Sequence, residues 1–435
     1  MTTPDPDPSS SDRPARRGLT RRRLLGTAGG AVGVLASGGA GYALASDDSV
    51  DHTKVVGGVV PFHGTHQAGI ATAAQDRLVF GSFDLLTDDA AQVRDVLQAW
   101  TVAAEKLTKG LPVGTLAGND EEPPEDTGEA QGLPAAQLTL TFGFGPTFFE
   151  QDGKDRLGLR SRQPKLLRDL GPLPGDELDE ARSGGDLCVQ ACSNDPMVAF
   201  HAIRNLNRIG RGVVVLRWTQ LGFGRTSTTS RAQSTPRNLM GFKDGTNNIR
   251  SEDVAGMNRH VWVGREEPQT WMQGGSYLVA RRIRILIESW DRDRIGDQEA
   301  VIGRRKVSGA PIGHGSEFDP IDLKATDGAG QTLVGPDAHV RLAAPETNGG
   351  LALLRRGYSF TDGIDPRTGQ LDAGLFFIAY QRDPHAQFVT LQRKLGVQDA
   401  LNEYIKHVGS GLFAVAGGVR PGQHIAEELF SGVRG

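Results

Sequence analysis

Hydrophobic and polar residues alternate along the chain in short blocks, and the spacing within each block predicts strands followed by amphipathic helices. One predicted strand, residues 212–220 (GVVVLRWTQ), is so apolar that it is expected to be buried. Helices are predicted over about 89–109, which Gly110 ends, and over 195–207, which an Asp-Pro pair begins. The acidic, Pro- and Gly-rich residues 111–133 predict an exposed loop. Three strands are expected in this half of the chain: 77–86, 137–144 and 212–220.

The second half of the chain repeats this pattern weakly. Residues 276–290 resemble the first strand, and residues 374–380, with a helix over 384–395, resemble the chain from residue 137 onward. Each half is therefore predicted to form one ferredoxin-like α+β unit, in which antiparallel strands carry helices on one face. A link rich in Ser, Thr, Arg and Pro near 230–237 predicts the boundary. The two domains expected from it are 58–235 and 236–435.

The first 45 residues have the pattern of a targeting segment. Three consecutive arginines at 21–23 precede a Gly-, Ala-, Val- and Leu-rich stretch that ends in a small-x-small triplet at 43–45. This pattern predicts a twin-arginine signal peptide cleaved near Ser46, followed by a polar lead-in over 46–57. A membrane anchor or an Arg-rich leader without a function is the alternative, but the Gly and Ala content disfavours stable residence in a membrane.

Export by the twin-arginine machinery would deliver the protein outside the cell or into the cell envelope. Such export suits proteins that bind a cofactor before they leave the cytoplasm. The chain carries 48 Lys and Arg against 52 Asp and Glu, and the first 45 residues hold six of the Arg and three of the Asp, which leaves a net charge of −7. This mild acidity gives no reason to expect nucleic acid as a partner.

Only two cysteines occur, Cys188 and Cys192. Their Cα atoms would lie about 13 Å apart on a strand, too far for a disulfide, and about 6 Å apart on a helix. The surrounding DLCVQACSNDP is typical of a strand that runs into a turn. We therefore expect two free thiols.

Three segments carry candidate chemistry. Asp244 lies between glycines in GFKDGTNN (241–248), His339 lies on what the pattern predicts to be a short strand, and Arg355 is followed by Arg356. Taken singly, each has an ordinary explanation, because Asp-Gly is usually a plain turn, a lone His is usually structural, and paired Arg are common on edge strands. On a strand, only one of the two arginines can face inward.

Taken together, the three segments supply the groups that a haem peroxidase needs. A neutral imidazole can hold ferric iron from one side. On the other side, a carboxylate can take a proton from hydrogen peroxide and return it to the leaving oxygen. A guanidinium can stabilise the negative charge that grows during O–O cleavage. Glycine beside the carboxylate would let a flat porphyrin approach the backbone closely.

The sequence resembles the dye-decolourising (DyP-type) haem peroxidases, in particular their exported, deferrochelatase-like branch. The resemblance implies two ferredoxin-like domains in a DyP-type dimeric α+β barrel, with haem b bound mainly by the second domain. Residues 344–346 depart from the pattern of this family: they are Ala-Pro-Glu, where relatives often carry Asn-Pro-Arg near the haem propionates. The segments that carry the resemblance span the chain: FHGTHQAGI (62–70), DTGEA (126–130), GFKDGTNN (241–248), GGSYLVARRIRI (274–285), AHVRLAAP (338–345) and LRRGYSF (354–360).

By the same resemblance, Asp244 is the acid–base residue, His339 the axial haem ligand and Arg355 the second catalytic group, which also contacts haem. Three further haem contacts are implied: Gly245, Thr246 and Asn247. Among the other histidines, His314 is the next candidate ligand. His63 and His66 are expected to be structural.

The resemblance implies a peroxidase that uses hydrogen peroxide to oxidise dyes, phenolic or other bulky electron donors through an oxo-ferryl intermediate. A close alternative is a deferrochelatase-like protein that releases iron from haem for iron uptake, because both activities need the same pocket. A third hypothesis, from another class, is a non-catalytic haem-binding or storage protein. The expected partners are hydrogen peroxide, small-molecule donors and the export machinery, and an oligomer is compatible with the resemblance.

Overall fold

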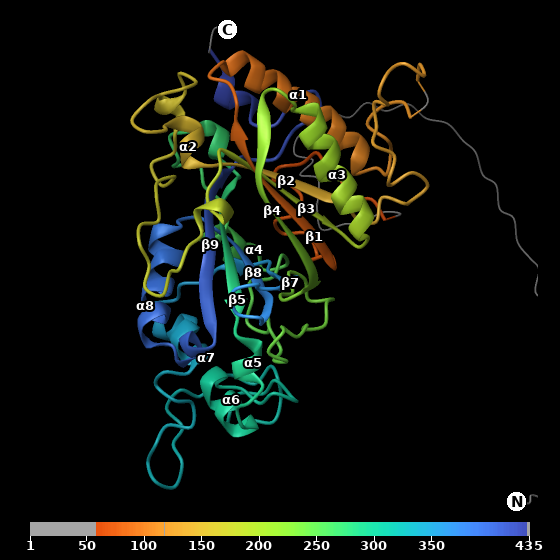
Figure 1. Ribbon diagram of the computed structural model, residues 1–435. Helices are drawn as coiled ribbons and strands as arrows, with labels where there is room; N and C mark the ends of the chain where they lie inside the picture. Colours follow the sequence, from red (N-terminus) through yellow and green to blue (C-terminus); the bar gives the residue numbers. More distant parts are fainter. Residues whose placement is uncertain (1–57, 117, 433–435) are drawn as a thin grey trace, which may run out of the picture. The chain divides into compact units, whose positions relative to one another are not determined.

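Two βαββαβ units of the same topology make up the part of the chain that the computed structural model describes, residues 58–116 and 118–432 (Figure 1). The predicted signal peptide and lead-in, 1–57, lie outside these residues, so the prediction of export stays a prediction. The first unit runs in chain order β1 (Arg77–Leu85), α1 (Ala90–Leu107), β2 (Thr139–Phe144), β3 (Leu187–Ser193), α3 (Pro196–Ile209) and β4 (Val214–Arg225).

The second unit has the same arrangement with more helices inserted. The strands of the first unit lie in the order β4-β1-β3-β2 and those of the second in the order β9-β5-β8-β7, with every pairing antiparallel. This shared order is that of the ferredoxin-like fold, which confirms the fold class predicted from the repeated sequence pattern. The strands of the second unit are β5 (Ser276–Ile285), β6 (Leu354–Arg355), β7 (Tyr358–Ile364), β8 (Leu371–Gln381) and β9 (Ile405–Val415).

The remaining helices are short. The α-helices are α2 (Pro146–Phe149), α4 (Val254–His260), α5 (Ile287–Trp290), α6 (Ile295–Ile302), α7 (His339–Ala343) and α8 (Thr390–Gln398). One π-helical turn, η5 (His385–Val389), precedes α8. The 3₁₀ turns are η1 (Arg160–Arg162), η2 (Glu180–Arg182), η3 (Thr270–Met272), η4 (Pro345–Thr347), η6 (Ala400–Glu403) and η7 (Glu427–Phe430).

The two units join edge to edge, so that their strands close into a barrel. β4 pairs with β7 through Phe223 and Ser359, and β2 pairs with β9 through Phe144 and Ala414. Closure leaves no free edge among these strands, which removes the hazard of unpaired backbone groups. Aromatic side chains fill the interior, where the ring centroids of Phe80 on β1 and Phe376 on β8 lie 5.3 Å apart in an edge-on arrangement.

Local sequence explains where the helices begin. The Asp89 carboxylate accepts a hydrogen bond from the Ala91 backbone N–H at 2.8 Å and so caps α1. Asp195 caps α3 in the same way, with Pro196 at the first helical position. The buried residues of α1 recur at helical spacing and pack against the sheet: Val93, Val96, Leu97, Trp100, Ala103, Ala104 and Leu107.

Two expectations about these elements need correction. The predicted strand 212–220 is not buried, since β4 exposes Val215 and Leu221 while it buries Val214 and Gln220. The run of apolar residues suggested burial on both faces, but side chains alternate along β4 and those on one face are exposed to solvent. The helix expected from 384 begins as the π-turn η5 and continues as α8.

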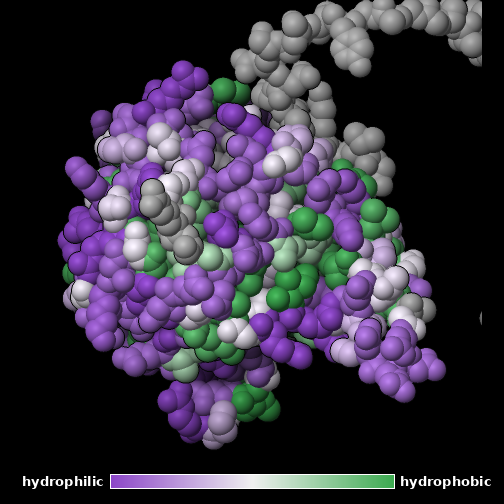
Figure 2. Space-filling model, turned by 90° about the horizontal axis from the view of Figure 1, so that it is seen from above, coloured by the Kyte–Doolittle hydropathy of each residue, from purple (hydrophilic) through white to green (hydrophobic). Residues whose placement is uncertain are grey.

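Other expectations agree with the structure. Cys188 and Cys192 both lie on β3 and are free, as predicted, and the structure shows that both are buried. The loop 111–133 is mostly exposed, with Asp126 as a buried exception. On the face seen in Figure 2, hydrophilic residues cover most of the surface and hydrophobic residues gather in small groups between them. Across the described ranges, no helix has both the length and the apolar character needed to span a membrane.

Candidate active site

A cavity of about 280 Å³ lies on the outer face of the second unit's sheet, opposite the barrel interior. Along β5, Arg281, Ile283 and Ile285 line the cavity, while Leu278 and Ala280 point into the barrel core. This alternation follows from the two-residue period of a strand. Most of the remaining lining is apolar, and much of it comes from β8, β9, α7, η5 and α8: Leu375, Phe377, Ile405, Val340, Ala343, Phe388, Leu391 and Leu395.

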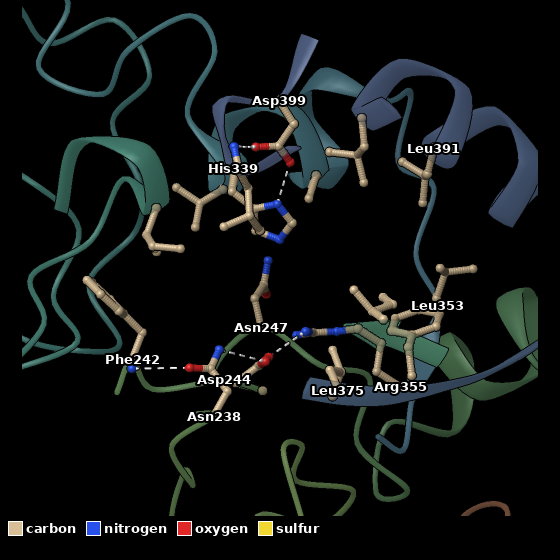
Figure 3. A pocket seen from close by; sticks show the side chains of 18 of the residues that line it. Asn238, Phe242, Asp244, Asn247, His339, Leu353, Arg355, Leu375, Leu391 and Asp399 are labelled. Atoms are coloured by element: carbon tan, nitrogen blue, oxygen red, sulfur yellow. Dashed lines mark hydrogen bonds and ion pairs between the residues drawn. The ribbon is translucent and has the colours of Figure 1, made fainter. Parts of the chain in front are cut away.

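His339 is the first residue of α7, and its imidazole points into the cavity (Figure 3). The prediction of a short strand at this position was wrong: residues 339–343 are helical. Nδ1 of His339 lies 2.6 Å from Oδ2 of Asp399. The carboxylate of Asp399 is buried, and its Oδ1 accepts a hydrogen bond from the Leu401 backbone N–H at 2.9 Å, which caps η6.

Asp399 orients the His339 ring. A carboxylate can only accept a hydrogen bond, so Nδ1 carries the proton and Nε2 keeps a free lone pair. Burial acts to lower the pKa of His339, but the charge and hydrogen bond of Asp399 outweigh burial, and the pKa is raised above its ordinary value. This is the arrangement by which proteins fix the tautomer and the basicity of a metal-binding histidine. Sequence reasoning missed Asp399, because nothing in VQDALNE marks it as a partner of a residue sixty positions earlier.

Asp244 and Arg355 form an ion pair on the opposite side of the cavity from His339 (Figure 3). Nη1 of Arg355 donates to Oδ1 of Asp244 at 2.7 Å, and Nδ2 of Asn238 donates to Oδ2 of Asp244 at 3.3 Å. Both residues line the cavity. The structure therefore brings together the three residues singled out from the sequence.

Asn248 joins the segment that contains Asp244 (residues 241–248) to β6, the strand that carries Arg355, by hydrogen bonds. Its Oδ1 accepts a hydrogen bond from the Arg355 backbone N–H at 2.9 Å, and its Nδ2 donates to the Arg355 carbonyl at 2.8 Å and to the Thr228 carbonyl at 2.9 Å. One buried amide thus pairs with the backbone of Arg355 as a neighbouring strand would. The sequence motif contains Asn248, but its role is visible only once the two segments lie side by side.

The two adjacent arginines face opposite ways, as strand alternation predicts. Arg356 is fully buried on the barrel side, where its guanidinium donates to the Thr72 carbonyl and to the Gln75 side chain. Arg355 alone reaches the cavity. The choice of Arg355 over Arg356 made from the sequence therefore agrees with the geometry.

Gly245, Thr246 and Asn247 also line the cavity, and Asn247 points across it toward His339 (Figure 3). The structure gives a reason for a glycine at 245 in addition to the one expected. Its φ is +99°, and a Cβ there would lie 2.8 Å from the Ser227 Cα, so the missing side chain makes room for neighbouring backbone.

The other histidines named from the sequence lie elsewhere. His314 does not line the cavity. His66 stacks on Trp262 with ring centroids 3.7 Å apart and donates to the Gly274 carbonyl at 2.6 Å, while His63 lies 3.3 Å from the Val419 carbonyl. Glu346, in the Ala-Pro-Glu departure, is exposed, whereas Ala344 and Pro345 line the cavity.

The donor set and lining fit haem. Its iron needs one axial ligand from the protein, and His339 offers a free Nε2 with its tautomer already fixed. A broad, mostly apolar cavity suits the faces of a porphyrin, and a paired carboxylate and guanidinium stand on the far side. The fold and the lining of the site therefore fit one class of protein, a haem enzyme.

Comparison with known proteins specifies the class further. Residues 67–224 match the family model for the N-terminal part of Dyp-type peroxidases, and residues 235–420 match the model for the C-terminal part. The chain belongs to the Dyp-type peroxidase family. It is thus an oxidoreductase that acts on peroxide, and members of the family are haem enzymes, in agreement with the cofactor predicted from the sequence.

Individual relatives support the assignment. Deferrochelatase of Escherichia coli (strain K12) is 37% identical over 365 residues, which cover 83% of this chain and 84% of the relative. Ferric DtpA from Streptomyces lividans is 40% identical with a TM-score of 0.78 and covers 86% of this chain and 98% of its own. The DyP-type peroxidase from Cellulomonas bogoriensis is 39% identical with a TM-score of 0.76, at the same coverage.

A second polar group lines the cavity on the β5 and β9 side. Arg281 is buried in an ion pair with Asp176, and His407 accepts a hydrogen bond from Gln392 at 3.1 Å. Burial, reinforced by the positive charge of Arg281, lowers the pKa of His407 to about 3. His407 is therefore neutral in the folded protein throughout the mildly acidic range.

We predict that Arg355→Leu slows the reaction with hydrogen peroxide by about 100-fold or more, because it removes a fixed donor from the place where negative charge develops. Arg356→Leu should instead lower the free energy of unfolding by about 1–3 kcal/mol, since it leaves buried acceptors unpaired. Stopped-flow rates per bound haem, with denaturant titrations of both variants, separate the two effects. Equal losses of rate would show that the two arginines do not differ in this way.

We also predict that His407 makes the protein less stable in acid. The unfolded chain takes up a proton at His407 below the ordinary histidine pKa of about 6.5, whereas the folded chain does so only near about 3. The stability contributed by neutral His407 is therefore present above about pH 6.5 and is lost as the pH falls, by about 2 kcal/mol between pH 7 and pH 5.

His407→Gln should remove that share of the acid sensitivity. Urea titrations at pH 8, 7, 6 and 5 would test this, with the interval from pH 8 to 7 as the internal control, since His407 is mostly neutral there in both states. Parallel stability curves for wild type and variant from pH 7 to 5 would contradict the prediction.

Proposed function

We propose that this peroxidase uses hydrogen peroxide to oxidise bulky organic donors such as dyes and phenols, with His339 as the axial ligand of haem b. The observation that carries the proposal is the Asp244–Arg355 ion pair, which faces His339 across one cavity. When bound there, haem supplies the iron at which the peroxide O–O bond is broken and stores the oxidising equivalents until donors return two electrons.

Asp244 is the proposed acid–base residue. Its carboxylate takes the proton from the oxygen of hydrogen peroxide nearer the iron and gives it to the other oxygen, which leaves as water. Arg355 stabilises the negative charge that grows on the leaving oxygen, and its own position is fixed through its backbone by Asn248. The apolar lining limits access of water, which strengthens both electrostatic effects.

His339 and Asp399 are the proposed groups on the ligand side. The hydrogen bond from Nδ1 to Asp399 gives the imidazole partial anionic character, and this favours the higher oxidation states of a bound iron. Gly245, Thr246 and Asn247 follow Asp244 in the chain, and they would contact haem from the side of the cavity opposite His339.

A second candidate function is the release of iron from haem with the porphyrin left intact. It is favoured by the 37% identity to deferrochelatase of Escherichia coli, over 84% of that protein. Fluorescence of metal-free porphyrin, measured after incubation with haem, distinguishes this reaction from peroxidase turnover. Passive haem storage is less well supported, because a storage pocket has no need of the Asp244–Arg355 pair.

We further propose export through the twin-arginine pathway, on the sequence of residues 1–45 alone. Mass spectrometry of the protein from the culture medium or envelope should then find a chain that begins near Ser46. An intact N-terminus on exported protein would contradict the cleavage.

We predict that the purified protein shows an intense Soret band that shifts when peroxide is added, and that His339→Ala abolishes stable haem binding or changes the spin state. Visible spectra of wild type and variant at equal protein concentration provide the measurement. His314→Ala is the matched control, because His314 lies outside the cavity, and its spectrum should equal that of wild type. An unchanged spectrum for His339→Ala would assign the ligand role to another residue.

We predict that peroxidase turnover is best in acid, at about pH 4–5. An unperturbed aspartate titrates at about 3.9, against about 6.5 for histidine, and acid–base catalysis works best when the working pH is near the pKa of the group. Asp244→Asn and Asp244→Ala should slow the reaction with peroxide by about 10²–10⁴-fold and change its pH dependence. If both variants react as fast as wild type at every pH, Arg355 alone carries the chemistry on this side.

A further inference from the structure

Four side chains with lasting positive charge line the cavity, and three of them are neutralised. A buried carboxylate is costly unless it is paired, so an unneutralised cation in the lining is the place to look for a partner to a cofactor carboxylate. The neutralised side chains lie in ion pairs: Lys243 with Glu317, Arg281 with Asp176 and Arg355 with Asp244.

Arg304 is the fourth, and it forms no ion pair within the described residues. It is 7% exposed, and its Nη1 donates to the carbonyl oxygens of Gly309 at 2.7 Å and Glu317 at 3.0 Å. Its Nε and Nη2 have no hydrogen-bond partner in residues 58–116 and 118–432. Carbonyl groups orient a guanidinium but leave its full charge, so this buried cation has two donors and a charge to offer to an anion.

The neighbours of Arg304 place it between the two sides of the site. On the His339 side, a Cβ at Gly303 would lie 2.5 Å from Val340, the residue after the ligand. On the other side, the Glu317 carbonyl accepts from Arg304, while the Glu317 carboxylate accepts from Lys243 and Thr246, which flank Asp244. A planar group held between His339 and Asp244 would therefore have its rim near Arg304.

The β5 and β9 side of the cavity does not offer the same charge. Arg281 is neutralised by Asp176, and His407 is neutral because burial and Arg281 lower its pKa. Burial also lowers the pKa of Arg304; Glu317 opposes this effect and Arg355 adds to it. An anion beside Arg304 would offset the free-energy cost of burying its charge. This side of the cavity is therefore the one that favours a negatively charged group.

We propose that Arg304 binds a carboxylate of the haem propionates. The proposal rests on the proposed function of the cavity as the haem site and adds to it the residue that sets the orientation of the ring. The contact is a charge-assisted hydrogen bond from the free Nε and Nη2 groups to the carboxylate, a geometry that guanidinium suits better than ammonium.

The test compares haem with its dimethyl ester, in which both propionates are neutral. The full-length wild-type chain and the Arg304→Gln variant are each loaded with either pigment, and loss of the pigment to an excess of a haem scavenger is followed by absorbance. Wild type should lose the ester about 10- to 100-fold faster than haem, the effect of one lost charge-assisted hydrogen bond. In Arg304→Gln, haem should leave about as fast as the ester does.

Two controls separate the role of Arg304 from general damage to the loop. Arg305→Gln alters the adjacent, half-exposed arginine, which pairs with Glu299 and does not line the cavity, and it should behave as wild type. Arg304→Lys keeps the charge and should keep part of the preference for haem over the ester. If Arg304→Gln fails to fold, the comparison of the two pigments in wild type and Arg304→Lys still tests the proposal.

Each outcome has one meaning. Wild type that binds haem and ester equally well overturns the proposal, as does an Arg304→Gln variant that still prefers haem to the wild-type extent. Faster loss of both pigments by the same factor also overturns it, because a lost carboxylate contact affects only haem. If wild type binds neither pigment, the proposed haem function itself fails.

Discussion

β5 is buried along its whole length on both faces, and this constraint governs where its charged side chains point. One face of β5 and β8 closes the barrel core, and the other forms the floor of the cavity. A charged residue on such a strand cannot turn to solvent, so it must find a partner or serve the site. Along β5, Arg281 meets Asp176 on the cavity side, while Arg282 is held by Asp362 and Asp372 on the other.

The same constraint explains why neighbouring arginines have different tasks. Arg356 is enclosed by the barrel, where its donors satisfy the Thr72 carbonyl and Gln75 and contribute to structure. Arg355, one residue earlier, meets Asp244 in the cavity. Pairing of β6 with β8 on one side and the hydrogen bonds of Asn248 on the other fix the register of Arg355, and a shift by one residue would exchange the two side chains.

The fold class, and the three residues that the structure brings together in one cavity, could be predicted from the sequence because both leave local signals. The repeated strand–helix pattern follows hydrophobic spacing, and Asp244, His339 and Arg355 lie in recognisable segments. Sequence reasoning misplaced His339 on a strand because AHVRLAAP has no helical period long enough to identify a five-residue helix. It missed Asp399, Asn248 and Arg304 because their roles depend on contacts between segments far apart in the chain, which a single sequence does not show.

In the function proposed above, peroxide would enter the cavity beside the ion pair of Asp244 and Arg355. With Oδ1 bonded to Arg355 and Oδ2 to Asn238, the carboxylate is oriented before any substrate enters, so little reorganisation is needed when a proton moves. The backbone of Arg355 is held independently of Asp244, because Asn248 bonds to its N–H and its carbonyl and makes no bond to the guanidinium. Two separate anchors therefore hold the Asp244 carboxylate and the Arg355 backbone. In the proposed function, a peroxide molecule would interrupt the hydrogen bond between the two side chains while Asp244 keeps its bond to Asn238 and the Arg355 backbone keeps its bonds to Asn248.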